Sequence, residues 1–129
     1  MIKIQELLDQ GYNFFTGVPD SGLKPFINEI VESGVPHIIA ANEGQAVGIA
    51  AGAELAGKKA CVYLQNSGLG NIINPLTSLC IPHKIEPLLI IGHRHTLPQH
   101  KVMGEVDEKL LGLIGYSSYI IVKAGNNVK

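Results

Sequence analysis

Glu43 stands at the start of a stretch of small and apolar residues that carries no other charge before Glu54. A helix built from such residues packs closely against a sheet, a second helix or a second subunit. A carboxyl group at the start of that helix would lie in low-dielectric surroundings. Such surroundings raise the pKa of a carboxyl group, which suits proton exchange near neutral pH. A glutamate in a first helical turn is also simply favoured by the helix dipole. The residues alone leave both interpretations of Glu43 open.

A second polar group, Gln65–Asn71, reads Gln-Asn-Ser-Gly-Leu-Gly-Asn and follows an apolar run. A glycine-rich segment between a strand and a helix is typical of phosphate-binding loops. This segment has no lysine and matches neither the Walker A nor the GxGxxG motif. We therefore expect its amides and hydroxyl to hydrogen-bond a heterocycle or a partner, rather than a phosphate.

Arg94 lies near three histidines: His93, His95 and His100. A guanidinium presents a fork of donors suited to a carboxylate or a phosphonate, so this segment is either a site for an anionic substrate or a solvated loop. The spacing of the histidines gives no reason to expect a metal site. Asp20 and Ser21 follow another short apolar run, and they either face a ligand or cap the next helix.

Strand-like and helical segments alternate along the chain, and this alternation predicts a parallel sheet with right-handed crossovers. In such a sheet the loops that follow the strands line a ligand crevice at one edge. The conspicuous polar groups all fall in those loops: Gly17–Ser21, Asn42–Glu43, Gln65–Asn71 and Gly92–His100. We expect strands at 14–16, 37–41, 60–64, 87–91 and 119–123, helices at 2–10, 23–34, 43–56, 71–80 and 106–114, and a polar loop over 92–105.

The composition is that of one globular domain spanning residues 1–129, since 46% of the residues are hydrophobic and 16% are charged. A net charge of −1 argues against a nucleic-acid-binding protein. No apolar run approaches the length of a membrane span, and the first ten residues do not resemble a signal peptide. The two cysteines, Cys61 and Cys80, lie in apolar surroundings, so we expect buried thiols and a cytoplasmic location.

Three of these segments together resemble the N-terminal, pyrimidine-binding domain of thiamine-diphosphate decarboxylases, most of all the phosphonopyruvate and sulfopyruvate decarboxylase group. They are Phe15–Ser21, Ala41–Gly44 and Gln65–Asn71, and Pro98–His100 resembles a Pro-Gln-His segment of the phosphonopyruvate enzymes. The resemblance implies an α/β fold: a three-layer, doubly wound parallel sheet of the thiamine-diphosphate-binding type, without the last helix–strand unit of that domain.

The resemblance also implies roles for particular residues. Glu43 matches the catalytic glutamate that hydrogen-bonds N1′ of the cofactor's aminopyrimidine, with the thiazolium ring serving as electron sink. Residues of the glycine-rich segment are implied to bind the cofactor: Asn66, Gly68, Leu69 and Asn71. Residues of two other loops are implied to bind the substrate: Asp20, Ser21, Arg94 and His100. The implied reaction converts 3-phosphonopyruvate to phosphonoacetaldehyde and CO2, with conversion of sulfopyruvate to sulfoacetaldehyde as the alternative.

The chain departs from the family pattern because it has no Gly-Asp-Gly…Asn signature. In the family that motif binds Mg2+ and the diphosphate in a separate pyrophosphate-binding domain. We therefore expect a carboxy-lyase that works only with a partner, either a pyrophosphate domain or a β subunit, in a homo- or hetero-oligomer. Two other functions stay open: a non-catalytic assembly module, and a carboligase resembling acetolactate synthase.

Overall fold

The computed structural model describes residues 1–123 and contains one five-stranded sheet in which every pair of neighbouring strands is parallel. The strand order is β2-β1-β3-β4-β5. The strands are β1 (Phe14–Gly17), β2 (His37–Ile39), β3 (Ala60–Gln65), β4 (Leu88–His93) and β5 (Tyr119–Lys123). Each of the five expected strands is therefore confirmed, with small differences at the ends.

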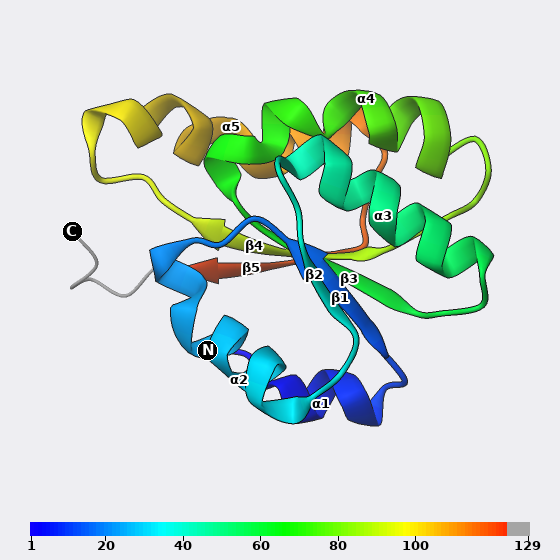
Figure 1. Ribbon diagram of the computed structural model, residues 1–129. Helices are drawn as coiled ribbons and strands as arrows, with labels where there is room; N and C mark the ends of the chain where they lie inside the picture. The colour runs from blue at the N-terminus through cyan, green and yellow to red at the C-terminus, as the bar shows by residue number, and fades with distance from the viewer. Residues whose placement is uncertain (124–129) are drawn as a thin grey trace.

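Helices cover both faces of the sheet, as Figure 1 shows. On one face lie α1 (Ile4–Asp9) and α2 (Lys24–Ser33), with the short 3₁₀-helix η1 (Ser21–Leu23) leading into α2. On the other face lie α3 (Glu43–Leu55), α4 (Ile73–Pro75) and α5 (Pro98–Ile114). The 3₁₀-helix η2 (Asn66–Asn71) precedes α4, and the π-helical turn η3 (Leu76–Cys80) follows it. This arrangement confirms the predicted three-layer, doubly wound α/β fold.

Two apolar clusters hold the layers together, one on each face of the sheet. Successive side chains of a strand point to opposite faces, so Cys61 and Tyr63 of β3 join the cluster under α1 and α2, and Val62 and Leu64 join the other. Both cysteines are buried, as expected. Because β3 is covered on both sides, it reads as an unbroken apolar run.

The start of α5 differs from the expectation drawn from the sequence. The helix begins at Pro98 rather than near residue 106, so the polar loop after β4 is confined to Arg94–Leu97. Proline is favoured in the first turn of a helix because its missing N–H has no partner there in any case. The first turn is polar and mostly exposed, so it lacks the apolar periodicity that marks a helix.

The strand order places a topological switch point between β1 and β3. The chain moves outward from β1 to β2 in one direction, and from β3 through β4 to β5 in the other. In open parallel sheets the crevice at the carboxyl ends of two such strands is where ligands bind. The segments after β1 and β3 carry the candidate residues Asp20, Ser21 and Asn66–Asn71.

Candidate functional site

The first turn of α3 fixes the position of Glu43. Asn42 is the N-cap residue, and its Oδ1 accepts a hydrogen bond from the backbone N–H of Gln45 at 2.9 Å. In return, the side chain of Gln45 accepts one from the backbone N–H of Ala41. The first bond satisfies a backbone donor that the helix leaves free, and the second ties the residue before the cap to the first turn, so Glu43 is held at the carboxyl edge of the sheet.

The carboxylate of Glu43 rests on η2. Asn71 Nδ2 donates to Glu43 Oε1 at 2.8 Å. At Gly68 a Cβ atom would lie 2.4 Å from Glu43 Cγ and 2.7 Å from Glu43 Oε2, so only glycine admits the carboxylate here. Among the described residues no side chain or backbone donor bonds Oε2, and Glu43 is half-exposed in the isolated chain. The structure thus presents one anchored and one available carboxylate oxygen.

A second polar cluster surrounds Arg94. Its Nη2 donates to Asp20 Oδ1 at 3.0 Å and to the hydroxyl of Ser21, and Gln65 Nε2 donates to the same Asp20 oxygen at 2.8 Å. The Arg94 and Asp20 side chains are 9% and 3% exposed, so this is a nearly buried ion pair. Asp20 therefore holds Arg94 and Gln65 in place. It also stands at the N-cap position of η1, where its backbone carbonyl accepts from Leu23 N–H, but neither Asp20 nor Ser21 makes a side-chain cap hydrogen bond.

Two polar atoms of this cluster are buried without a hydrogen-bond partner among the described residues: Asp20 Oδ2 and Arg94 Nε. Asp20 Oδ2 lies in a slot beside Gly92, where a Cβ atom would be 2.5 Å away. A cavity of about 290 Å³ opens next to the cluster, lined by Pro19, Asp20, Ser21, Lys24 and Ile27. The donors that line this cavity are Lys24 and the hydroxyl of Ser21, and Arg94 adjoins the cavity through its bonds to Asp20 and Ser21. This set of donors fits a site for an anion.

A third cluster, around Asp107, is buried between η2, β4 and α5. Asn66 Nδ2 donates to Asp107 Oδ2 at 3.0 Å, and His93 Nδ1 lies 2.6 Å from the same oxygen. Asp107 is not among the site residues predicted from the sequence, although it falls on the inner stripe of α5 among buried or half-buried apolar residues: Met103, Leu111 and Ile114. A charged residue on an apolar helical stripe is the signal that could have identified it.

The predicted site residues thus separate into groups. Glu43, Gly68 and Asn71 meet at one place, and Asp20, Ser21 and Arg94 meet at another. Two residues proposed to contact the cofactor, Asn66 and Leu69, are fully buried: Leu69 in the apolar core and Asn66 in the Asp107 cluster. His100 lies in the first turn of α5, half-buried, with its Nδ1 atom buried and unpartnered among residues 1–123.

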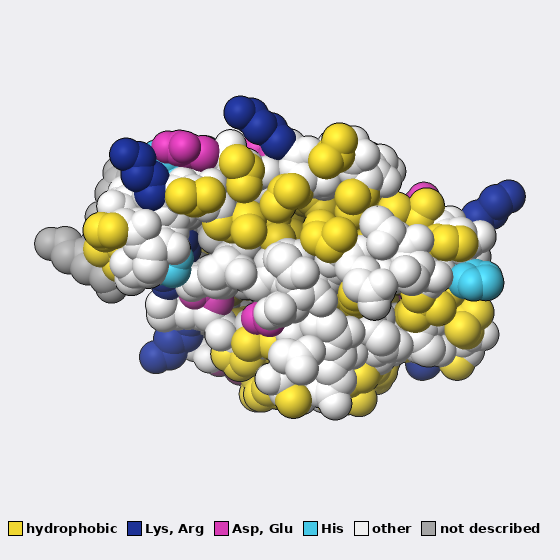
Figure 2. All heavy atoms as spheres, turned by 90° about the horizontal axis from the view of Figure 1, so that it is seen from above, with side chains coloured by type: hydrophobic (Ala, Val, Ile, Leu, Met, Phe, Trp, Pro, Cys, Tyr) yellow, Lys and Arg dark blue, Asp and Glu magenta, His cyan; other side chains and the backbone are white. Residues whose placement is uncertain are grey.

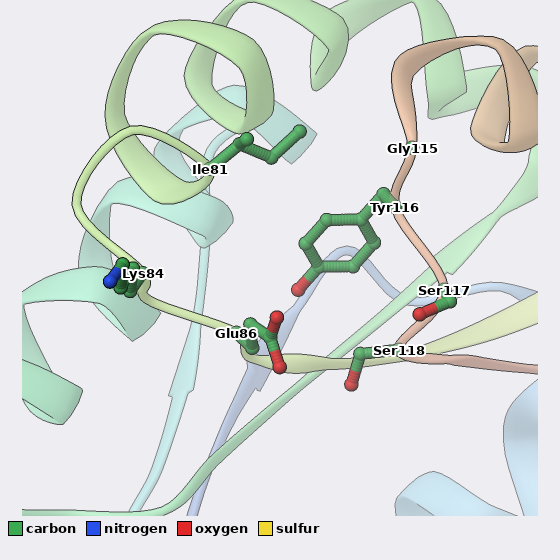
Figure 3. Close-up of a pocket in the computed structure, with 7 residues that line it drawn as sticks. All are labelled: Ile81, Lys84, Glu86, Gly115, Tyr116, Ser117 and Ser118. Carbon is green, nitrogen blue, oxygen red and sulfur yellow. The ribbon is translucent and has the colours of Figure 1, made fainter.

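The opposite edge of the sheet carries a smaller cavity of about 90 Å³, shown in Figure 3. It lies where the chain enters β4 and β5, and Tyr116 and Glu86 line it. The Tyr116 hydroxyl donates to the backbone carbonyl of Pro87, which ties together the two connections that meet there. Burial raises the pKa of Tyr116. None of the candidate site residues lines this cavity. The hydrogen bond from Tyr116 joins the two segments that enter the sheet here.

The outer face of the α3–α4–α5 layer is unusually apolar. Figure 2 looks onto this layer and shows hydrophobic side chains gathered across its middle. On α3, Gly48 and Gly52 are exposed and Leu55 is 73% exposed, and on α5 Val102 and Leu113 are 74% and 84% exposed. Large exposed apolar patches mark interaction surfaces. In the part of the chain that the structure describes, no helix is both long and apolar enough to cross a membrane.

Comparison with known proteins gives one matching family. The family model described as "Thiamine pyrophosphate enzyme, N-terminal TPP binding domain" matches residues 3–110. That range includes every candidate site residue named above.

Individual relatives are similar over most of this chain. Phosphonopyruvate decarboxylase of Streptomyces viridochromogenes is 40% identical over 109 residues, which cover 80% of this chain and 28% of that protein. Sulfopyruvate decarboxylase subunit alpha of Methanocaldococcus jannaschii is 42% identical over 118 residues, which cover 88% of this chain and 70% of that subunit. The same subunit of Methanococcus maripaludis is 40% identical over 111 residues, 81% of this chain and 66% of the relative. The chain therefore spans little more than a quarter of the phosphonopyruvate decarboxylases it matches.

Proposed function

Because this chain belongs to the thiamine pyrophosphate enzyme family, as an N-terminal TPP binding domain, we propose that it supplies one half of the active site of a 2-oxoacid decarboxylase. The observation that carries the proposal is the Glu43 carboxylate, anchored by Asn71 and seated on Gly68 at the edge of the sheet. A carboxylate with one fixed and one available oxygen can hold a proton against a ring nitrogen of a bound heterocycle.

The residues present fit the pyrimidine ring of thiamine diphosphate. Because Gly68 has no side chain, the Glu43 carboxylate can lie against η2, and its Oε2, unpartnered among the described residues, can then meet a ring nitrogen. When bound, the cofactor supplies the carbon nucleophile and the electron sink for decarboxylation. In the proposal Glu43 exchanges a proton at Oε2, Asn71 holds the other oxygen, and the backbone of Gly68–Leu69 lines the ring.

The proposed substrate is a three-carbon 2-oxoacid with a second anionic group. We name 3-phosphonopyruvate, and sulfopyruvate is equally supported by the relatives. Arg94 would bind the second anion together with Lys24, because its Nη2 bonds Asp20 and Ser21, and these two residues line the cavity with Lys24. In this proposal Ser21 and His100 contact the substrate, whereas Asp20 acts by holding the guanidinium.

A partner chain is part of the proposal. Within residues 1–123 no group of three or more His, Cys, Asp or Glu side chains is arranged to hold a metal ion. We place Mg2+ and the diphosphate on a pyrophosphate-binding domain or β subunit, and two of the relatives are themselves named as alpha subunits. The apolar face around α3 suits this docking, because it starts at Glu43 and carries no charge between Glu43 and Glu54.

The experiment that tests the function starts with affinity purification of this chain from its host and identification of the chains that accompany it. The purified assembly is then assayed with thiamine diphosphate, Mg2+ and each oxoacid, for CO2 and aldehyde. We expect turnover, and we expect Glu43→Gln to lower kcat by orders of magnitude while the circular dichroism spectrum stays the same. Normal turnover in Glu43→Gln contradicts the proposal. Partner binding without any turnover indicates an assembly module, and a hydroxy-oxoacid product indicates a carboligase.

A further inference from the structure

The backbone of Arg94 is held by a side chain from a different loop. Asn66 Nδ2 donates to the carbonyl oxygen of Arg94 at 2.9 Å, and Asn66 Oδ1 accepts from the backbone N–H of Arg94 at 3.2 Å. One amide group thus satisfies both backbone groups of a single residue, as a neighbouring strand would. Arg94 is the first residue after β4, so Asn66 fixes the point at which the chain leaves the sheet.

Asp107 in turn holds Asn66. The Asp107 carboxylate is 3% exposed and meets donors on both oxygens. Oδ2 accepts from Asn66 Nδ2 and lies 2.6 Å from His93 Nδ1, and Oδ1 accepts from the backbone N–H of Glu108 at 2.7 Å. Because the carboxylate offers no proton, His93 must carry one on Nδ1. Asp107 therefore sets the direction of the Asn66 amide and the tautomer of His93 together.

This cluster lies on the other side of the sheet from the guanidinium of Arg94. His93 turns toward α5, where it meets Asp107, whereas Arg94 turns toward the start of η1, where it meets Asp20 and Ser21. Alternation along an extended chain gives neighbouring residues opposite directions. Helix α5 comes close to the intervening backbone, because a Cβ atom at Gly104 would be 2.7 Å from the Arg94 carbonyl oxygen. The hydrogen bonds that lead from Asp107 toward the proposed ligand site run through Asn66 to the backbone of Arg94.

We propose that Asp107 is a positioning residue for Arg94: through Asn66 and His93 it sets the backbone from which the guanidinium reaches the second anionic group of the substrate. The inference rests on the proposed function for the identity of that anion. It assigns Asp107 and His93 a role in substrate recognition, and it changes the role of Asn66 from contact with the cofactor to support of the substrate site.

The kinetic test uses the complete assembly carrying Asp107→Asn, which preserves the shape of the side chain and removes its charge. We expect KM for the oxoacid to rise at least about tenfold, as for loss of one charge-assisted hydrogen bond, with kcat within about twofold of the unchanged protein. Glu108→Gln is the matched control, because Glu108 is the next residue on α5 and is exposed, and it should leave both constants unchanged. An unchanged KM in Asp107→Asn overturns the inference, as does a fall in kcat at constant KM.

A second pair of measurements does not depend on turnover. Nitrogen-15 NMR of the imidazoles should show His93 in the Nδ1–H tautomer, and Asp107→Asn should shift it toward the Nε2–H tautomer. Calorimetry with 3-phosphonopropanoate, which has both anionic groups but no 2-oxo group, should show binding weakened about tenfold in the variant. If Asp107→Asn does not fold, His93→Phe removes the imidazole and with it the Nδ1 donor to Asp107, and it should weaken binding in the same direction.

These measurements separate the two proposals. An assembly that decarboxylates neither oxoacid but binds 3-phosphonopropanoate in an Asp107-dependent manner refutes the proposed function and supports the positioning role. An active assembly in which Asp107→Asn and His93→Phe bind 3-phosphonopropanoate as tightly as the unchanged protein refutes the positioning role alone.

Discussion

At the scale of single residues, the candidate site depends on the lack of a side chain at Gly68 as well as on the carboxylate of Glu43. Gly68 leaves the space that the Glu43 carboxylate occupies. We predict that Gly68→Ala displaces this carboxylate and lowers kcat of the assembly at least about tenfold, while the circular dichroism spectrum stays unchanged. Gly70→Ala is the control, because a Cβ atom there meets nothing within 4 Å. Equal activity of the two variants would show that catalysis does not require contact between the Glu43 carboxylate and η2.

The Asp20–Arg94 pair gives a prediction about stability. Removing one member of a nearly buried ion pair leaves the other charge unpaired, which typically costs about 3–5 kcal/mol. We therefore expect Asp20→Ala to lower the free energy of unfolding by about that amount in urea titrations. Lys3→Ala removes an ion pair with Glu29 in which the side chains are 66% and 28% exposed, and it should cost less than about 1 kcal/mol. Similar losses in both variants would contradict the structural role of the buried pair.

At the scale of elements, α3 has two glycines at exposed positions of its interior, where alanine would favour the helix. Gly48 and Gly52 are exposed, and a Cβ atom at either position meets nothing within 4 Å. Alanine is favoured over glycine in a helix interior by about 1 kcal/mol. We predict that Gly48→Ala raises the thermal stability of the isolated chain and weakens its association with the partner, measured by calorimetry. Stronger association of this variant would show that the partner docks elsewhere.

Much of the fold could be predicted from the sequence, because strands and helices alternate with clear apolar patterns. The start of α5 could not, since Pro98, Gln99 and Lys101 form an exposed polar turn that reads as loop. The candidate site shows the same limit. Glu43 stands out as a lone charge in its segment, whereas Asp107 is one of several charges in its helix. Its place on the apolar stripe of α5 is the signal that sets it apart in the sequence, but only the packing of α5 against η2 and β4 shows that Asp107 contacts Asn66 and His93. The roles carried over from the family for these residues stay predictions.

At the scale of the whole molecule, the stability of the fold should depend on pH through His37. This residue lies at the start of the edge strand β2, with Nε2 2.7 Å from the hydroxyl of Tyr63. Burial lowers the pKa of His37 below its ordinary value of 6.5 and raises that of Tyr63 to about 12. The folded chain therefore takes up a proton at His37 less readily than the unfolded chain does.

It follows that the free energy of unfolding decreases as pH falls below about 6.5, because the unfolded state then binds more protons. Above that pH the imidazole is neutral in both states and this contribution disappears. Urea titrations between pH 5 and pH 8 should show a smaller loss on acidification in His37→Gln than in the unchanged protein. Identical pH dependence of the two proteins would refute the assignment to His37.

The two hydrogen bonds between the Asn66 side chain and the backbone of Arg94 matter for protein engineering. Arg94 is fixed by Asn66, His95 packs against Gly104, and the carbonyl oxygen of Leu97 accepts from the backbone N–H of His100 in α5. Thr96, the remaining residue of this connection, is exposed. We expect insertions at Thr96 to leave the backbone of Arg94 and the start of α5 in place, so the length of the connection can be varied while the guanidinium keeps its position.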